Sequence, residues 1–130
     1  MTIDKGEQIK QWNVAAFAAF NDGTNVDDFV ALFAPEFTNF YLDSSLLIEG
    51  RIDQQSLQAL YDTGMKPNLQ LRHFAVQLYE DFAVCTGYVV GTVTLATGAV
   101  LQGPWRFSSV VVPHADSWQT VHNHWSPLRP

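Results

Sequence analysis

The second half of the chain consists of four apolar segments, at residues 69–79, 82–95, 99–112 and 118–126. These segments are rich in β-branched and aromatic residues, which favour strands. They are separated only by Glu80-Asp81, by Thr97-Gly98 and by residues 114–117, and connections this short join antiparallel neighbours. The sequence therefore predicts consecutive antiparallel hairpins, and this pattern limits the possible folds more than any other feature.

The first half of the chain has the apolar spacing of helices. Apolar residues recur at intervals of three and four behind a possible N-cap at Asp4 and before Asn21-Asp22-Gly23: Ile9, Trp12, Ala16, Ala19 and Phe20. This pattern predicts a first helix with one apolar face, which packs against the rest of the molecule.

Two shorter helices and one strand are expected after the first helix. Asn25 is a suitable N-cap for a helix that runs through Phe33 and is stopped by Pro35. A strand is expected over residues 37–42, followed by a loop that closes at Gly50. Asp53 is then the expected N-cap of a third helix, which carries Leu57, Leu60 and Tyr61 and is broken by Gly64 and Pro67.

Charge is scarce in this sequence and unevenly placed. Charged residues make up 15% of the chain, against about a quarter in a typical globular protein. Residues 1–66 hold ten acids and four bases, whereas residues 67–130 hold three of each. The strands are apolar or small on both faces, as in a sheet covered on both sides. Helices can cover only one face, so we expect a homodimer, or a larger oligomer, formed through the other.

The composition also excludes several classes of protein. A net charge of −6 opposes binding to nucleic acid and to anionic membranes. The single cysteine, Cys85, allows no internal disulfide, and no apolar run is long enough to span a membrane. Residues 1–10 lack the apolar core of a signal peptide. We therefore expect a cytoplasmic protein without a cofactor or a metal, and with no linker or repeat we expect a single domain over residues 1–130.

Three helices followed by an antiparallel meander form an α+β architecture. A strongly curved sheet wrapped around the first helix makes a cone with an open mouth, and Gly87, Gly91 and Gly103 are candidate bend points. A small molecule would bind at such a mouth.

Three stretches of sequence carry a resemblance to a known family. WQTVHNHWSPLRP (residues 118–130) resembles the Trp-Gln-x-Val-His-x-His-x-Ser signature that ends the association domain of calcium/calmodulin-dependent protein kinase II. TNFYLDSSLLIEG (38–50) and VALFAPE (30–36) resemble other parts of that group. The resemblance implies the cone-shaped α+β fold of the nuclear-transport-factor-2-like, or SnoaL-like, superfamily. That superfamily includes ketosteroid isomerases, cyclases, dehydratases and assembly domains, so the fold names no reaction.

The catalytic positions implied by the resemblance are not retained. Tyr41 stands where the steroid isomerases have their general-base aspartate, Ala16 where they have an oxyanion-hole tyrosine, and Phe107 near their protonated aspartate. Without these groups, proton transfer beside a carbonyl lacks its acid and base. The arginines that line the kinase association domain's pocket fall here at Val89, Ser109 and Trp125, which disfavours an anionic ligand.

Side chains alternate between the two faces of a strand, so every second residue of the strands matched by the resemblance is expected to face the cavity. Two residues of the first helix are expected to face it as well. The members of this set are Trp12, Ala16, Asn39, Tyr41, Trp105, Phe107, Ser109, Val121, Asn123 and Trp125. An aromatic cavity with a few neutral polar groups suits an uncharged or weakly polar small molecule. The alternative is that the aromatic rings simply fill the cone.

Two further functions stay open at this point. An isomerase, cyclase or dehydratase would act through Tyr41 and Asp43, since Asp43 and Glu49 are the carboxylates expected near the mouth. An association module would serve only to oligomerise through the outer face of the sheet.

Three residues with reactive or charged side chains are expected on that outer face. His122 and His124 share one face of their strand, but two histidines need a third ligand to hold a metal, so we expect a structural or interface role. Arg106 points away from Trp105 and Phe107, and an acid of a second subunit would pair with it.

The single cysteine, Cys85, lies within an apolar strand and is expected to be a buried thiol.

Overall fold

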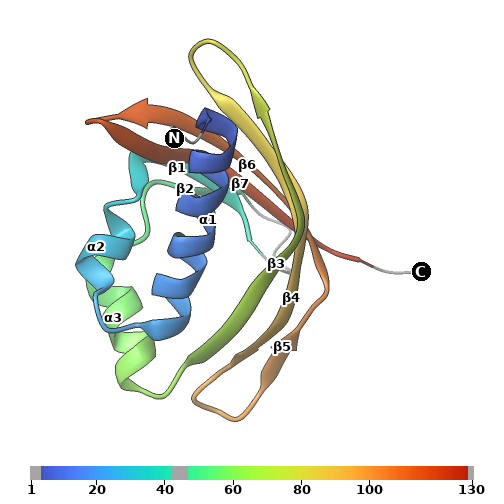
Figure 1. The fold of residues 1–130 in the computed structure, drawn as a ribbon. Coiled ribbons are helices and arrows are strands. Elements are labelled where there is room, and N and C mark those ends of the chain that lie inside the picture. Colours follow the sequence, from blue (N-terminus) through green and yellow to red (C-terminus); the bar gives the residue numbers. More distant parts are fainter. Residues whose placement is uncertain (1–3, 42–46, 129–130) are drawn as a thin grey trace.

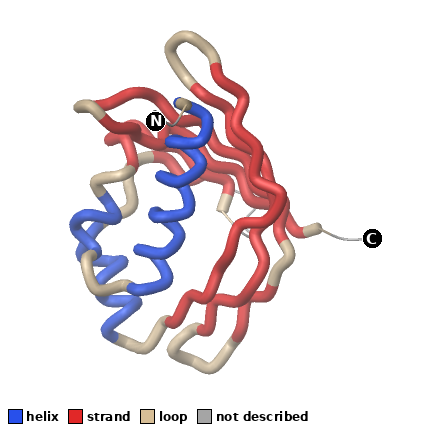
Figure 2. Tube along the Cα trace, in the orientation of Figure 1, coloured by secondary structure: helices blue, strands red, loops and turns tan. Residues whose placement is uncertain are grey.

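Three helices pack on one side of a strongly curved sheet in the computed structural model of this protein (Figures 1 and 2). The structure describes residues 4–41 and 47–128. Within these residues the helices are α1 (Lys5–Asp22), α2 (Val26–Val30) and α3 (Gln54–Asp62). The strands are β1 (Phe33–Phe40), β2 (Leu47–Glu49), β3 (Lys66–Leu78), β4 (Ala83–Thr94), β5 (Val100–Gln102), β6 (Trp105–His114) and β7 (Ser117–Pro127). The predicted α+β class, with helices on a curved, open sheet, is confirmed.

The sheet contains the predicted hairpins and one pairing that was not predicted. Its strand order is β2-β1-β7-β6-β4-β3, with β5 paired to β4, and the β3–β4, β4–β6 and β6–β7 pairs are all antiparallel. The strand β1 pairs in parallel with β7, with Asn39 opposite Asn123. This long-range pairing places the N-terminal strand beside the C-terminal one, and β2, in the segment expected to be a loop, pairs with β1.

The helix boundaries follow the capping residues. Asp4 Oδ1 accepts a hydrogen bond from the Glu7 amide at 2.9 Å, and Gly23 ends α1 with φ of 69°. Asp53 caps α3 by accepting from the Ser56 amide at 2.9 Å and from the Ser56 hydroxyl at 2.8 Å. These two bonds to Ser56, the side-chain one first, lower the pKa of the Asp53 carboxyl. The first and third predicted helices are therefore confirmed with their caps.

The second helix is shorter than predicted. It ends at Val30, and Phe33, expected to be its last apolar residue, begins β1. The backbone of Phe33 pairs with Thr120 of β7, and Pro35 lies where the β1–β7 register shifts, so its missing amide breaks no ladder bond. Pairing with a distant strand thus overrides the local helical spacing.

The single strand predicted over residues 99–112 is divided into two strands, β5 and β6, with Gly103 and Pro104 between them. The amide of Gly103 donates to Gly91 O at 3.0 Å across the sheet. A second irregularity lies in β3, where the register with β4 shifts between Arg72 and Ala75. Gly87 lies opposite this bulge, so all three glycines expected as bend points are at irregularities of the sheet.

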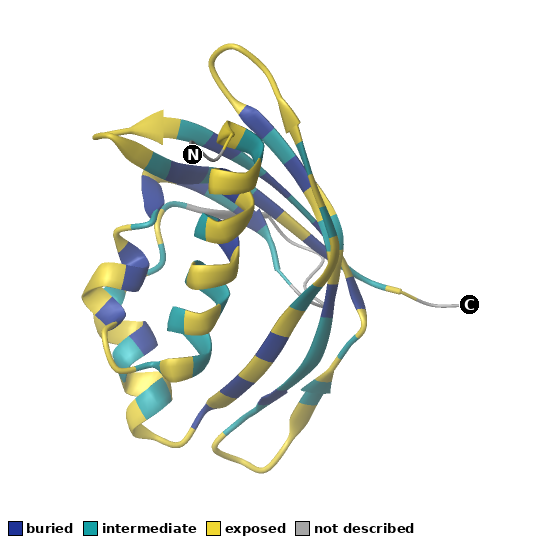
Figure 3. Cartoon of the chain, in the orientation of Figure 1, coloured by how far each residue is buried: buried dark blue, intermediate teal, exposed yellow. Residues whose placement is uncertain are grey.

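Helix α1 lies along the concave face, and its exposed side is turned away from the sheet (Figure 3). Asn21 fixes its C-terminal end to β3, since its side chain donates to Leu69 O at 2.8 Å and accepts from Leu69 N at 2.9 Å. Ile9 lies in a small cluster with Ala83, Cys85 and Val111. No described helix is both long and apolar enough to cross a membrane.

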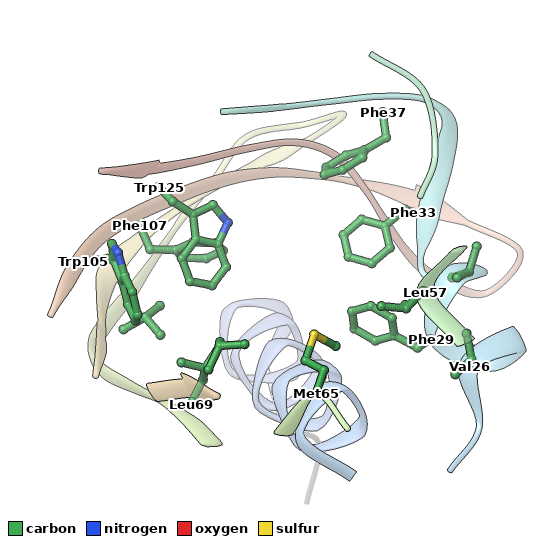
Figure 4. Close-up of a cluster of buried hydrophobic side chains, with 13 residues drawn as sticks. Val26, Phe29, Phe33, Phe37, Leu57, Met65, Leu69, Trp105, Phe107 and Trp125 are labelled. Atoms are coloured by element: carbon green, nitrogen blue, oxygen red, sulfur yellow. The ribbon is translucent and has the colours of Figure 1, made fainter. Parts of the chain in front are cut away.

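The main core cluster lies between the helices and the sheet (Figure 4). Trp105, Phe107 and Trp125 gather at one end of it. At the other end, the ring of Phe29 lies next to Leu57 from α3, with Phe33 and then Phe37 beyond them. No described element of the chain covers the opposite face of the sheet.

Candidate ligand-binding site

Four neighbouring strands place one small polar residue each on the concave face, in a single row. Asn39 of β1 is the Cα partner of Asn123 of β7, which faces Ser109 of β6, which faces Cys85 of β4. We call these four residues the polar row. All four are less than 9% exposed, and Asn13 of α1 lies above the Cys85 end, with its Nδ2 atom 3.9 Å from Sγ. The strand register thus builds a continuous polar stripe in an otherwise apolar interior.

Several polar atoms at this stripe have no hydrogen-bond partner within the described chain. They are Asn39 Oδ1, Asn123 Oδ1, Ser109 Oγ and Trp125 Nε1. The great majority of buried polar groups are paired, because leaving one without a partner costs about 1–3 kcal/mol. Four such atoms on adjoining positions therefore make this stripe a candidate site for contact with a ligand or water.

Aromatic side chains adjoin the polar row on one side. Trp125 lies 4.9 Å from Phe107 and 5.7 Å from Tyr41, both measured between ring centroids. Trp105 contacts the same indole at 6.2 Å, and Phe17 of α1 lies over Phe107 and Trp125 at 5.5 and 5.7 Å. We call these five residues the aromatic group. Together, the row and the group combine acceptor oxygens, one indole donor and flat apolar surface.

The site is electrically neutral at physiological pH. Among its described residues there is no lysine, arginine, aspartate, glutamate or histidine. Burial raises the pKa of Tyr41 to about 12, so its phenol stays protonated. Burial also raises the pKa of the Cys85 thiol, against a smaller opposing effect of Ser109 and Asn13. A charged ligand would lose its hydration here without gaining a counter-charge.

The structure brings together most of the residues predicted to face the cavity. Seven of them lie in the row or the aromatic group: Asn39, Tyr41, Trp105, Phe107, Ser109, Asn123 and Trp125. Their role in binding stays a prediction. The predicted Asp43 lies outside the described residues, as does the side chain of Glu49.

Three predicted residues lie elsewhere. Trp12 packs against the small cluster of Ile9 and its neighbours, and Ala16 is half-buried on α1. Val121 lies at a bulge, because Val110 pairs with His122 whereas Val111 pairs with Thr120. Counting by twos from Asn123 does not hold across that extra residue.

Two residues of α1 that sequence reasoning did not select belong to the site. Asn13 and Phe17 follow Ile9 at intervals of four, so all three share the helix face that meets the sheet. The apolar pattern through Trp12 and Ala16 does not include Asn13, because its side chain is polar. The four-residue spacing from Ile9 is the signal that would have found both.

The outer face of the sheet holds a separate groove of about 430 Å³. Its polar lining comes from His73, Thr86, Tyr88, Arg106, Ser108, His124 and Ser126. As predicted, Arg106 points away from the interior, and it donates to Pro127 O at 3.2 Å. His122 and His124 share this face, where Phe40 packs against both rings and Thr38 Oγ1 lies 2.7 Å from His122 Nδ1.

The family of the chain follows from a comparison with known proteins. The model of the SnoaL-like domain matches residues 9–130. The chain belongs to the SnoaL-like domain family. A search of curated proteins finds no match to the sequence.

Solved structures that resemble this SnoaL-like chain agree on the fold. An NTF2-like protein from Cytophaga hutchinsonii is 11% identical, with a TM-score of 0.79 and with 97% of this chain and 100% of that chain covered. The kinase II hub homology domain of Chlamydomonas reinhardtii is 17% identical, with a TM-score of 0.73 and coverages of 98% and 100%. A ketosteroid isomerase-like protein from Erwinia carotovora is 20% identical, with a TM-score of 0.70 and coverages of 99% and 100%. The resemblance stated from the sequence is thereby confirmed at the level of the fold.

Proposed function

We propose that this SnoaL-like protein binds an uncharged aromatic small molecule between the polar row and the aromatic group. The observation that carries the proposal is the set of four buried polar atoms that have no hydrogen-bond partner among the described residues. Three are oxygens, which accept hydrogen bonds, and the fourth is the indole N–H of Trp125, which can only donate. A ligand with both a donor and an acceptor, such as a phenol or a cyclic amide, satisfies both kinds of atom.

The neutrality of the site supports the choice of an uncharged ligand. The buried aromatic rings offer stacking and edge contacts that favour a flat molecule. By contrast, Arg106 and His124 line the groove on the outer face of the sheet, so the strands separate them from the interior. An anion entering the interior would therefore have no cation to pair with among the described residues.

A matched pair of probes tests this proposal. Titration calorimetry with 2-naphthol and with 2-naphthoate, at pH 7, compares a neutral and an anionic molecule of similar shape. We expect 2-naphthol to bind and to raise the melting temperature, with naphthoate at least tenfold weaker. Equal affinity for the two, or no binding of 2-naphthol and other neutral aromatic molecules, would contradict the proposal.

A second candidate function is an isomerase or dehydratase in which Tyr41 donates a proton or hydrogen bond. It is favoured by the raised pKa of Tyr41, which keeps the phenol neutral beside Trp125. For such an enzyme, Tyr41→Phe is expected to lower turnover by about 10²- to 10³-fold while the fold is kept. Because the protonated phenol is the active form, turnover should persist to about pH 10 and fall as the pH approaches 12.

The assay for this second candidate follows the isomerisation of a β,γ-unsaturated ketosteroid by absorbance, with circular dichroism as the control for folding. An active wild-type protein whose Tyr41→Phe variant turns over at the same rate would remove Tyr41 from the chemistry.

We also propose that the protein forms a homodimer through the outer face of its sheet. No described element covers this face, and its half-buried valines, such as Val110, lie beside polar residues. Light scattering should give twice the 14.6 kDa mass of the chain at micromolar concentration. Val110→Arg is expected to yield monomers, whereas Gln11→Arg on the exposed side of α1 should not. A wild-type monomer would contradict this expectation.

A further inference from the structure

We infer that the ligand of this protein is elongated, with an apolar tail that lies in a groove between α1 and β3 while its polar head meets the polar row. This inference rests on the proposed function and adds a second compartment to the same site. The groove has a volume of about 290 Å³ and lies beside the edge strand of the sheet. We call it the side groove.

The lining of the side groove is suited to a hydrocarbon chain. One stripe of α1 contributes Val14, Phe17, Ala18 and Asn21, and β3 contributes residues 69–72. Val14 is 51% exposed, which leaves a β-branched apolar side chain open to solvent on a helix. The apolar surface therefore has no cover from any described part of the chain.

The polar groups around the side groove are already bonded to one another. Both ends of the Asn21 amide are bonded to the backbone of Leu69, at 2.8 and 2.9 Å. The Arg72 guanidinium donates to Gln70 Oε1 at 2.8 Å and to Leu71 O at 3.1 Å. A polar tail would have to displace these bonds, so an apolar tail fits the groove better.

Phe17 connects the side groove to the interior. Phe17 lines the groove, and the centroid of its ring lies 5.5 Å from that of Phe107, edge-on, and 5.7 Å from that of Trp125. The indole nitrogen of Trp125 is one of the atoms that have no partner within the part of the chain that the structure describes. Phe17 therefore stands between the side groove and the aromatic group, and the proposed ligand requires its ring to turn aside.

The size of the side groove argues that it holds part of a molecule. Ligand pockets usually measure about 300–1,000 Å³, so 290 Å³ is at the lower limit for a complete site. A chain attached to a ring at the polar row would fit a groove of this size.

A series of 4-alkylphenols, from methyl to octyl, tests this inference on the full chain. For the wild-type protein we expect affinity to rise about three- to fourfold with each added methylene, until the groove is filled. Ala18→Trp places an indole in the groove and should abolish this rise, while the affinity for 4-methylphenol stays within twofold of the wild-type value. Val14→Trp is a second variant with the same expectation.

The control is Ala15→Trp, one residue outside the stripe that lines the groove, which should keep the full dependence on chain length. If 4-methylphenol binds but affinity is independent of chain length, or if both groove variants keep the rise, the side groove is not the tail compartment and the proposed function stands. If 4-methylphenol fails to bind, the proposed function fails as well. Binding of 4-octylphenol that is insensitive to Asn123→Leu would separate the groove from the polar row and overturn the inference.

Discussion

Replacing Asn123 with leucine is expected to make the protein more stable and at the same time to weaken 2-naphthol binding at least tenfold. Asn123 is 8% exposed, and its Oδ1 atom has no partner in the described chain. An apolar residue of similar size removes that penalty, so the free energy of unfolding should rise by about 1 kcal/mol. The same change removes an acceptor from the centre of the polar row, which costs the ligand a hydrogen bond.

Chemical denaturation and calorimetry on the same samples check both effects. Asn68→Leu is the matched control, because Asn68 is exposed on β3 and its side chain is outside the site. Asn68→Leu should change neither the free energy of unfolding nor the affinity for 2-naphthol appreciably. A destabilised Asn123→Leu protein that binds 2-naphthol as the wild type does would show that the row is a structural feature and would refute its role in binding.

The largest expected loss of stability follows from Gly91→Ala. Gly91 has φ of +116°, and a Cβ atom there would lie 2.0 Å from the backbone oxygen of Asn68 on the neighbouring strand. Since this neighbour is backbone within a paired strand, the sheet itself must shift. We expect a loss of about 3–5 kcal/mol in the free energy of unfolding.

Gly98→Ala separates the two causes of that loss. Gly98 has φ of +89°, but a Cβ atom at this turn would meet nothing within 4 Å. Its substitution should therefore cost only the backbone strain, about 1 kcal/mol. Equal losses for the two variants, measured by thermal and urea denaturation, would show that the contact with Asn68 has no effect.

Local patterns in the sequence were enough to predict most of the helices and strands, though not the end of α2, the strand β2 or the break between β5 and β6. Asp4 and Asp53 cap their helices because a short carboxylate side chain can accept from amides two or three residues ahead, which depends on nothing distant. The hairpins of the second half follow from short turns between β-branched segments. The resemblance of residues 118–130 to a known signature supplied the family fold that the comparisons confirm.

The choice of most site residues was also possible from the sequence, because the side chains of a strand alternate between its two faces. Counting by twos selected Asn39, Ser109, Asn123 and Trp125, which contribute the four buried polar atoms that lack a partner in residues 4–41 and 47–128. The scarcity of charge in residues 67–130 likewise anticipated the neutral interior. It also motivated the expected dimer, which stays a prediction.

The tertiary structure decided how these residues meet. The parallel pairing of β1 with β7, which joins residues more than eighty positions apart, sets Asn39 beside Asn123 and also ends α2 before Phe33. The bulge at Val121 removed that residue from the alternation. The docking of α1 turned Phe17, rather than Trp12, toward Trp125. Caps and alternation arise between near neighbours and are readable in the sequence, whereas register and docking depend on contacts between distant segments, which only the folded chain provides.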